Sequence, residues 1–145
     1  MESPQNMEIS SQVEHSLSDK WVLWAHLPHD TDWSLKSYTN LLEISTVEEI
    51  TTLFNSIPDK MTKNCMLFLM RKGIRPTWED PSNANGGSFS YKVSNKFVPD
   101  VWKKLFYLVC GETICTDTEL CKYVNGITIS PKKNFCIIKI NLKRV

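Results

Sequence analysis

Residues 65–80 read Cys-Met-Leu-Phe-Leu-Met-Arg-Lys-Gly-Ile-Arg-Pro-Thr-Trp-Glu-Asp, and this stretch decides the fold. Its first six residues form a continuous apolar run, which is typical of a central strand covered on both faces. Residues 73–82 contain a glycine and two prolines, and they are predicted to form a loop. This loop carries Trp78, Glu79 and Asp80. Loops held by a rigid sheet are where binding residues concentrate, so the loop is a candidate site.

Further strands and helices are expected on both sides of this run. Ser45 or Thr46 can cap a helix whose apolar residues recur at spacings of three and four up to Pro58. A second amphipathic helix is expected from Pro99 to Gly111. The remaining predicted elements are strands at residues 21–27, 38–44, 88–93, 124–129 and 135–142, and a short helix at residues 116–121. The sequence therefore predicts an α+β fold, with a mainly antiparallel sheet and helices on one face.

The composition fits one globular domain. The chain has 145 residues, 41% of them hydrophobic, and a net charge of +1, so any basic site must be local. Residues 1–17 are polar and are expected to form a flexible tail, with one domain over residues 18–145. We expect neither a secretory leader nor a membrane-spanning segment. The five cysteines contain no CxxC pair and indicate reduced thiols in a cytoplasmic protein.

Enzyme signatures are missing from the sequence. It contains no P-loop, no GxGxxG, no HExxH and no GxSxG motif. His15, His26 and His29 lie near the N-terminus without an obvious nucleophile, and we interpret them as packed or solvated side chains. We therefore expect that the protein is not an enzyme and that it needs neither a metal nor another cofactor.

The five tryptophans divide into two groups. Trp21, Trp24 and Trp102 lie in apolar patterns and are predicted to be core residues. Trp33 and Trp78 lie in loops between polar residues. Each could be a buried loop anchor, or it could contact a ligand.

The pair Trp78-Glu79 suits a guanine base. A single carboxylate can accept hydrogen bonds from both N1–H and the N2 amino group, while an adjacent indole stacks on the ring. N7-methylation makes the base cationic and strengthens its attraction to indole faces. Local positive charge near a phosphate chain could come from Lys132, Lys133 and Lys139, although a solvated lysine turn is the simpler interpretation.

Several segments together resemble translation initiation factor 4E, the protein that binds the messenger-RNA cap. They are His15-Ser-Leu with Trp21-Val-Leu-Trp24, then Trp33, residues 45–57, Leu67-Phe68, residues 72–80, Gly86-Gly87, Trp102 and residues 108–112. Their order and spacing match the family from about residue 15 to residue 143. The run Gly-Ile-x-Pro-x-Trp-Glu-Asp is the most specific piece. The short, lysine-rich and isoleucine-rich chain also suggests a viral or otherwise fast-evolving member.

This resemblance implies a fold, a ligand and a site. The family fold is a curved antiparallel sheet with helices on its convex face and the 7-methylguanosine cap in the concave face. The resemblance makes Trp33 and Trp78 the stacking indoles and Glu79 the reader of the guanine edge. Capped mRNA would be the ligand, translation initiation the process, and the cytoplasm the location.

The sequence departs from the family at the positions that usually hold the cap phosphates. Ser130 and Phe135 stand where the family has an arginine and a lysine, so Lys132 and Lys133 are candidate replacements. Lys139 stands where the family has a tryptophan near the N7-methyl group. These departures leave room for an interaction module that has lost the cap, or for a general binder of single-stranded RNA. A decapping enzyme is a more distant alternative.

A second departure concerns the convex face, where the resemblance implies docking of a helix from scaffold factor 4G or from a repressor. Thr51 stands in place of the family's tryptophan anchor. His15 and Val47 are retained, and Lys103 and Lys104 occupy the matching part of the second helix. The partner is therefore expected to be a 4G-like scaffold, a different and more acidic protein, or none, and a cap-sequestering repressor is an alternative role. The chain ends where the family normally continues with a helix and further strands, which predicts a C-terminally shortened sheet.

Overall fold

The computed structural model describes residues 14–77 and 79–143, apart from the side chains of residues 59, 60 and 63. Six strands form one sheet in the order β2-β1-β3-β5-β6-β4, and every neighbouring pair is antiparallel. The strands are β1 (Ser16–His26), β2 (Tyr38–Thr46), β3 (Met66–Arg71), β4 (Gly87–Ser94), β5 (Val124–Pro131) and β6 (Phe135–Leu142). The helices are α2 (Val47–Ser56), α3 (Asp59–Asn64), α4 (Pro81–Ala84), α5 (Val98–Cys110) and α6 (Thr118–Cys121), with 3-10 turns η1 (Leu35–Ser37) and η2 (Asn95–Phe97).

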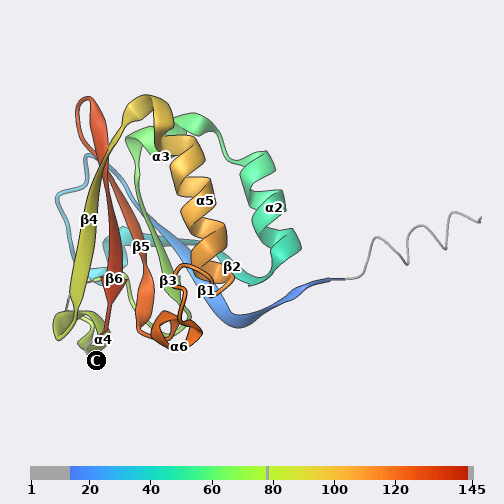
Figure 1. Ribbon diagram of the computed structural model, residues 1–145. Helices are drawn as coiled ribbons and strands as arrows, with labels where there is room; N and C mark the ends of the chain where they lie inside the picture. Colours follow the sequence, from blue (N-terminus) through green and yellow to red (C-terminus); the bar gives the residue numbers. More distant parts are fainter. Residues whose placement is uncertain (1–13, 78, 144–145) are drawn as a thin grey trace, which may run out of the picture.

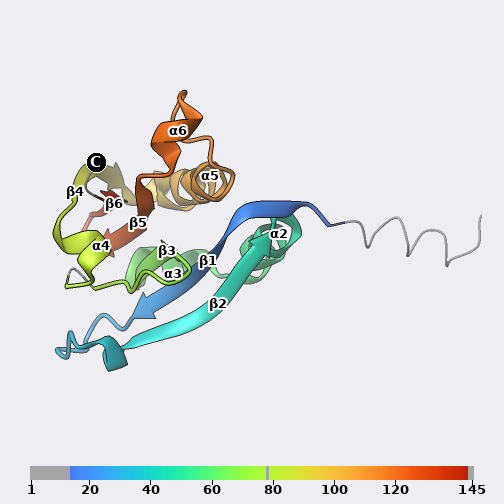
Figure 2. The same ribbon diagram turned by 90° about the horizontal axis from the view of Figure 1, so that it is seen from below.

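The sheet is curved, and its two long helices lie on the same face. Figures 1 and 2 show α2 and α5 side by side on this convex face, while the loop between β1 and β2 extends beyond the far end of the strands. Among the described residues, the opposite, concave face carries no long helix, and only the short α4 lies at its rim. The predicted α+β class, with a curved antiparallel sheet and helices on the convex face, is confirmed.

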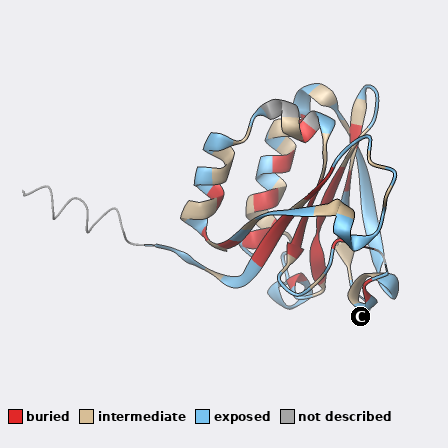
Figure 3. Cartoon of the chain, turned by 180° about the vertical axis from the view of Figure 1, so that it is seen from behind, coloured by how far each residue is buried: buried red, intermediate tan, exposed pale blue. Residues whose placement is uncertain are grey.

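The main core lies between the sheet and these two helices. Trp21 and Trp102 are 0% and 1% exposed, as expected from the sequence. Trp24 lies outside this core cluster, because side chains alternate across a strand and its cross-strand neighbour is Phe68, a concave-face residue. Buried residues concentrate on the central strands in Figure 3, whereas the edge strand β4 is mostly exposed.

The predicted central strand is confirmed. β3 lies between β1 and β5, and all four residues from Leu67 to Met70 are buried. Leu67 and Leu69 belong to the main core, whereas Phe68 and Met70 line the concave face. The continuous apolar run is therefore explained by burial of this strand on both faces.

Local capping sets the start of α2. The hydroxyl of Thr46 accepts a hydrogen bond from Glu49 N (3.2 Å), and the Glu49 carboxylate accepts one from Ser45 N (3.2 Å). This arrangement resembles a capping box, with the carboxylate bonded to the backbone of the residue before the cap. The sequence did not predict α3 and α4, because Pro58 was interpreted only as a helix end and the loop only as irregular chain. Each short helix instead starts at or directly after a proline.

The N-terminal boundary differs slightly from the expectation. β1 begins at Ser16 and the backbone of His15 already pairs with α2, so the expected boundary between residues 17 and 18 falls within the first strand. Residues 1–13 lie outside the described part of the chain. None of the described helices has the length and apolar character required to span a membrane.

Candidate functional site

A cavity of about 430 Å³ occupies the concave face of the sheet. Its floor comes from β3, β5 and β6, and its rim comes from the β1–β2 loop, α4 and the start of β4. The lining residues are Trp33, Tyr38, Met66, Phe68, Met70, Pro76, Asn83, Gly86, Gly87, Ser88, Thr128, Lys139 and Asn141. Apolar and aromatic walls with a few polar groups are typical of a site for a small organic ligand.

Trp33 lies at one side of this cavity and is 52% exposed. One face of its indole is covered by the ring of His26, with the two ring centroids 3.9 Å apart and the planes inclined by only 2°. His26 itself is 1% exposed, in agreement with its interpretation as a packed side chain. The structure thus fixes an indole at the cavity wall while leaving about half of it accessible.

The loop between β3 and α4 carries the second group of predicted site residues. Trp78 lies outside the described residues, so its expected stacking role stays a prediction. Pro76 lines the cavity. Pro76, Thr77 and Asp80 are all buried. The residues on either side of position 78 are therefore anchored, and Pro76 borders the cavity.

Asp80 holds this loop in place. One carboxylate oxygen accepts hydrogen bonds from Arg75 N (2.9 Å) and Arg75 Nε (3.3 Å), and the other accepts one from Ser82 N (2.9 Å). Burial opposes ionisation of Asp80, but the bonds from Arg75 and Ser82 outweigh it and hold the pKa of the carboxyl below its ordinary range. Asn83 adds two bonds from its amide, to the backbone oxygens of Arg75 and Thr77.

Glu79 is exposed and lies close enough to Tyr38 to affect its titration. Burial, and after it the negative charge of Glu79, raises the pKa of the Tyr38 phenol. Tyr38 lines the cavity and makes an edge-on contact with Trp33, with the ring centroids 6.4 Å apart. Glu79 itself does not line the cavity, but its charge acts on Tyr38, which does.

The three predicted phosphate-binding lysines are not in one place. Lys139 lies on β6, opposite Thr128 of β5 and Ser90 of β4, and it lines the cavity. Lys132 and Lys133 lie in the turn between β5 and β6 and are exposed, but neither lines the cavity. Lys139 is therefore the cation best placed to meet a charged group on a ligand bound in the cavity.

Sequence reasoning missed a polar residue of the cavity floor and a close approach between β3 and β5. Asn141 lies on the same face of β6 as Lys139, and its amide donates to the hydroxyl of Thr128 (2.9 Å). The alternation of polar and apolar residues along residues 135–142 could have indicated this polar face. Gly126 lies beside β3, where a Cβ would stand 2.0 Å from the backbone oxygen of Leu69, and no local sequence signal reports that approach.

The predicted partner-binding residues lie on or beside the convex helices. The backbone N–H of His15 donates to Glu48 (2.9 Å), and the backbone oxygen of His15 accepts from Val47 N (2.9 Å). Thr51 shares a hydrogen bond of 2.8 Å with the phenol oxygen of Tyr107, which joins α2 to α5. These contacts place His15, Val47 and Thr51 together at one end of the helical face.

The two predicted lysines lie on the other convex helix. Lys103 and Lys104 are exposed on α5. Lys103 also borders a small depression that includes Phe54 and Ile57, near the C-terminal end of α2. Among the described residues, no group of three or more histidine, cysteine, aspartate or glutamate side chains is arranged to hold a metal ion.

The fold and the cavity together define a class of protein: a curved antiparallel sheet that carries helices on one face and an aromatic ligand-sized cavity on the other. The model of one family, eukaryotic initiation factor 4E, matches residues 16–144. The chain therefore belongs to the eukaryotic initiation factor 4E family.

Two relatives illustrate the range of similarity. The chain is 34% identical over 130 residues to eukaryotic translation initiation factor 4E of Eremothecium gossypii, an alignment that covers 84% of this chain and 59% of that protein. It is 47% identical over 62 residues to a translation initiation factor 4E homologue of Acanthamoeba polyphaga mimivirus, covering 43% of this chain and 23% of the viral protein. The chain thus spans less than two thirds of the length of either relative.

Solved structures share the fold. A complex of eIF4E-3 from C. elegans with the 4E-binding protein Mextli and a cap analogue superimposes with a TM-score of 0.81 at 22% identity, covering 92% of this chain and 76% of that one. The complex of Ascaris suum eIF4E-3 with the m2,2,7G cap gives a TM-score of 0.79 at 21% identity, covering 90% and 74%.

Proposed function

We propose that this protein binds the 7-methylguanosine cap of mRNA in the concave cavity and acts in translation initiation. The base stacks between Trp33 and Trp78, and Glu79 accepts hydrogen bonds from N1–H and the N2 amino group of the guanine. The observation that carries the proposal is the half-exposed indole of Trp33 at the wall of a 430 Å³ cavity in a member of the initiation factor 4E family. Residues 18–145 form the cap-binding domain in this proposal.

The energetics favour a methylated base over an unmethylated one. Stacking on an aromatic side chain contributes about 1–3 kcal/mol per base, and a positive charge on the ring adds attraction to each indole face. Together with a forked carboxylate contact, two such stacks give a net binding free energy of about −8 kcal/mol, which corresponds to a micromolar Kd. Lys139, on the cavity floor, is the first candidate for contact with the phosphate chain.

Titration of the intrinsic tryptophan fluorescence tests the proposal directly. We expect strong quenching by 7-methyl-GTP and weak quenching by GTP. Trp33→Ala and Trp78→Ala should each abolish retention on a 7-methylguanosine resin, and Glu79→Gln should weaken it. Equal responses to the methylated and unmethylated nucleotides would contradict the proposal.

Two variants provide matched controls. Phe97→Ala removes an aromatic side chain that is 54% exposed but does not line the cavity, and Glu43→Gln neutralises a carboxylate that pairs with Lys72. Both should bind the resin as the unmodified protein does. Their circular dichroism spectra, compared with those of the site variants, separate loss of the site from loss of folding.

A second candidate function concerns the convex face. Thr51 presents a small hydroxyl side chain that is hydrogen-bonded to Tyr107, and two exposed lysines lie on the adjacent helix. These residues favour a partner that differs from the usual factor 4G scaffold and carries more acidic residues. A protein that binds the cap without binding the scaffold would sequester capped mRNA and act as a repressor. Capped-RNA pull-downs with factor 4G peptides distinguish the two roles, because only an activating factor binds both at once. The cytoplasm, where mRNA is translated, is the location that this proposal implies.

A further inference from the structure

The ring of His26 lies between two backbone carbonyl groups. Its Nδ1 is 3.0 Å from the oxygen of Leu27, and its Nε2 is 2.8 Å from the oxygen of Asp32. A carbonyl oxygen can only accept a hydrogen bond, and a neutral imidazole has a single N–H to donate. Both contacts are hydrogen bonds only when the ring carries two protons and a positive charge.

The same ring lies flat against Trp33. The centroid separation of 3.9 Å and the interplanar angle of 2° place the imidazole over the face of the indole. A cation over the face of tryptophan is attracted by the negative charge of the ring face. Since His26 belongs to β1 and Trp33 to the following loop, this contact ties the loop to the rigid sheet.

We propose that His26, in its doubly protonated form, is the positioning residue that holds Trp33 at the wall of the cavity. Its two N–H groups clamp the ends of the segment from Leu27 to Asp32, and its ring supports the indole from behind. This inference rests on the proposed function, because it assigns to His26 the orientation of a residue that stacks on the cap.

An acid lies near His26, although the ring is only 1% exposed and burial opposes its charge. The carboxylate of Asp32 is in the same loop, and its pKa is lowered, first by the backbone N–H of Ser34 and in smaller part by Lys36 and His26. On β2, the phenol of Tyr38 contacts the imidazole edge-on at 5.0 Å between centroids.

Three further residues lie near His26 or near its contact Tyr38: the acid Glu79 and the uncharged residues Met66 and Phe68. Glu79 acts on Tyr38 and adds a second negative charge to that side. On β3, the neighbours of His26 are Met66 and Phe68, and neither carries a charge. The groups described around His26 on the β1–β2 loop, β2 and β3 are thus acidic or neutral, apart from Lys36, which acts on Asp32.

The consequence is a cap affinity that depends on pH. Loss of one proton breaks one of the two bonds to the loop and removes the charge beneath the indole. Trp33 then becomes free to leave its orientation, and binding must include the entropy cost of ordering it again. Affinity should therefore be lower when the ring carries one proton than when it carries two.

The first test uses the protein without ligand. Nuclear magnetic resonance of 15N-labelled protein follows the two ring nitrogens of His26 and the indole N–H of Trp33 during a pH titration. We expect both nitrogens of His26 to be protonated in the ordered state, and the indole signal to change with the same midpoint. An indole signal that is unaffected when His26 loses its proton would overturn the proposal. This test does not depend on cap binding.

The second test compares His26→Phe with His29→Phe. Phenylalanine keeps a flat ring behind Trp33 but has no N–H, whereas His29 is exposed in the same loop and provides the matched control. At about pH 6 we expect His26→Phe to bind 7-methyl-GTP about tenfold more weakly than the control, the value of a charge-assisted hydrogen bond. The gap should close at alkaline pH, at which a neutral ring can donate only one of the two hydrogen bonds.

The result is expressed as the Kd of His26→Phe divided by the Kd of His29→Phe. The methylated base itself gives up its N1 proton in alkaline solution, and this change affects both variants equally. A ratio that is the same at both pH values, or equal to one throughout, would overturn the role of His26. If the unmodified protein failed to bind 7-methyl-GTP at any pH, the proposed function would fall, and the titration without ligand would still decide how His26 holds Trp33.

Discussion

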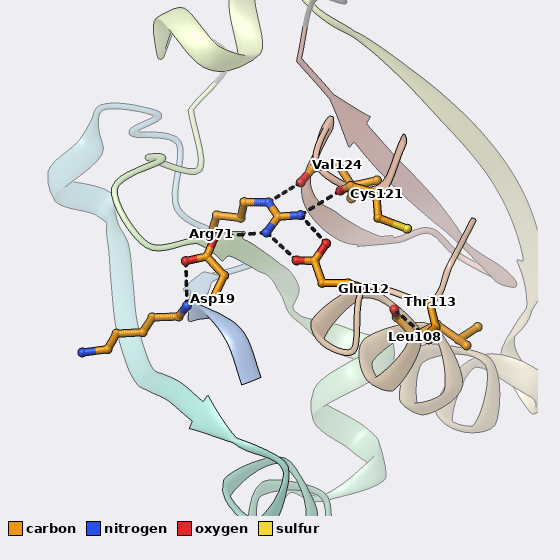
Figure 4. Close-up of polar contacts among 8 residues, drawn as sticks. Asp19, Arg71, Leu108, Glu112, Thr113, Cys121 and Val124 are labelled. Carbon is orange, nitrogen blue, oxygen red and sulfur yellow. Dashed lines mark hydrogen bonds and ion pairs between the residues drawn. The ribbon is translucent and has the colours of Figure 1, made fainter. Parts of the chain in front are cut away.

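The guanidinium of Arg71, at the end of β3, makes a two-point ion pair with the carboxylate of Glu112, which follows α5; the distance from Nη2 to Oε2 is 2.9 Å. Figure 4 shows that the same guanidinium also reaches Asp19 and the backbone oxygens of Cys121 and Val124. Burial disfavours the charge, but the carboxylates of Glu112 and Asp19 raise the pKa of Arg71 above its ordinary value. One side chain therefore joins β1, β3, β5 and the end of α5.

Removing this group should destabilise the protein strongly. Arg71→Met leaves the carboxylate of Glu112, only 18% exposed, without its partner, and we expect the free energy of unfolding to fall by about 3 kcal/mol. Lys72→Met is the matched control, because its ion pair with Glu43 is exposed and contributes at most about 1 kcal/mol. Urea unfolding measures both. Equal losses in the two variants would contradict the central role of Arg71.

The close approach of β5 to β3 should not tolerate a side chain at residue 126. A Cβ on Gly126 would lie 2.0 Å from the backbone oxygen of Leu69, so Gly126→Ala must move one strand. We expect a loss of about 3 kcal/mol in the free energy of unfolding, as in other overpacked sites. Gly87→Ala meets nothing within 4 Å and should change stability by less than about 1 kcal/mol. Thermal unfolding of both variants decides the point.

Asp80 should control the loop that carries Trp78 and Glu79. Asp80→Asn places an amide group where the carboxylate accepts bonds from Arg75 and Ser82, and we expect about tenfold weaker binding of 7-methyl-GTP by calorimetry. Asp100→Asn, exposed at the start of α5, is the control and should bind normally.

The pH dependence of Asp80 has a definite sign. Because the folded protein lowers the pKa of this carboxyl from 3.8, its ionised form stabilises the loop above pH 3.8, and this stabilisation is lost as the pH falls through the lowered value. Asp80→Asn should therefore lose the acid-induced loosening of the loop that the unmodified protein shows in hydrogen exchange. An unchanged acid response in the variant would assign the effect to another group.

Lys139 should contribute to phosphate binding more than the two turn lysines. It lines the cavity, whereas Lys132 and Lys133 do not. Lys139→Gln should therefore weaken binding of 7-methyl-GTP about fivefold. The slope of the logarithm of the binding constant against the logarithm of the salt concentration should become shallower by about 0.7. Binding of 7-methylguanosine, which has no phosphate, is the internal control and should be unaffected. A larger effect of the double change Lys132→Gln and Lys133→Gln would place the phosphates at the turn.

The convex face should recover scaffold binding when an aromatic anchor is supplied. Thr51→Trp replaces the hydroxyl that bonds to Tyr107 with a large apolar side chain, and we expect about tenfold tighter binding of a helical factor 4G peptide. Thr52→Trp adds the same side chain at a neighbouring exposed position of α2 and is the control. Fluorescence anisotropy of a labelled peptide reports both. Equal gains would indicate nonspecific apolar contact.

Local sequence was sufficient for most elements of the fold. Capping at Thr46, the apolar run of β3 and the proline and glycine at the ends of the second helix are signals that act within a few residues, and each element forms where they predict it. Trp24 was misassigned because apolar character does not say which face of a strand a side chain occupies. Its neighbour in β3 shows that the face is concave.

The sequence by itself therefore determined most of the elements, their order and the family, and it predicted which residues would suit a methylated guanine. Only the tertiary structure decided that Lys139 lines the cavity while Lys132 and Lys133 do not, and that His26 stacks on Trp33 and lies between two carbonyl groups. These facts depend on how strands pair and how the loop folds back over β1. Such contacts join residues that periodicity and composition treat as independent, so they are settled by packing rather than by local pattern.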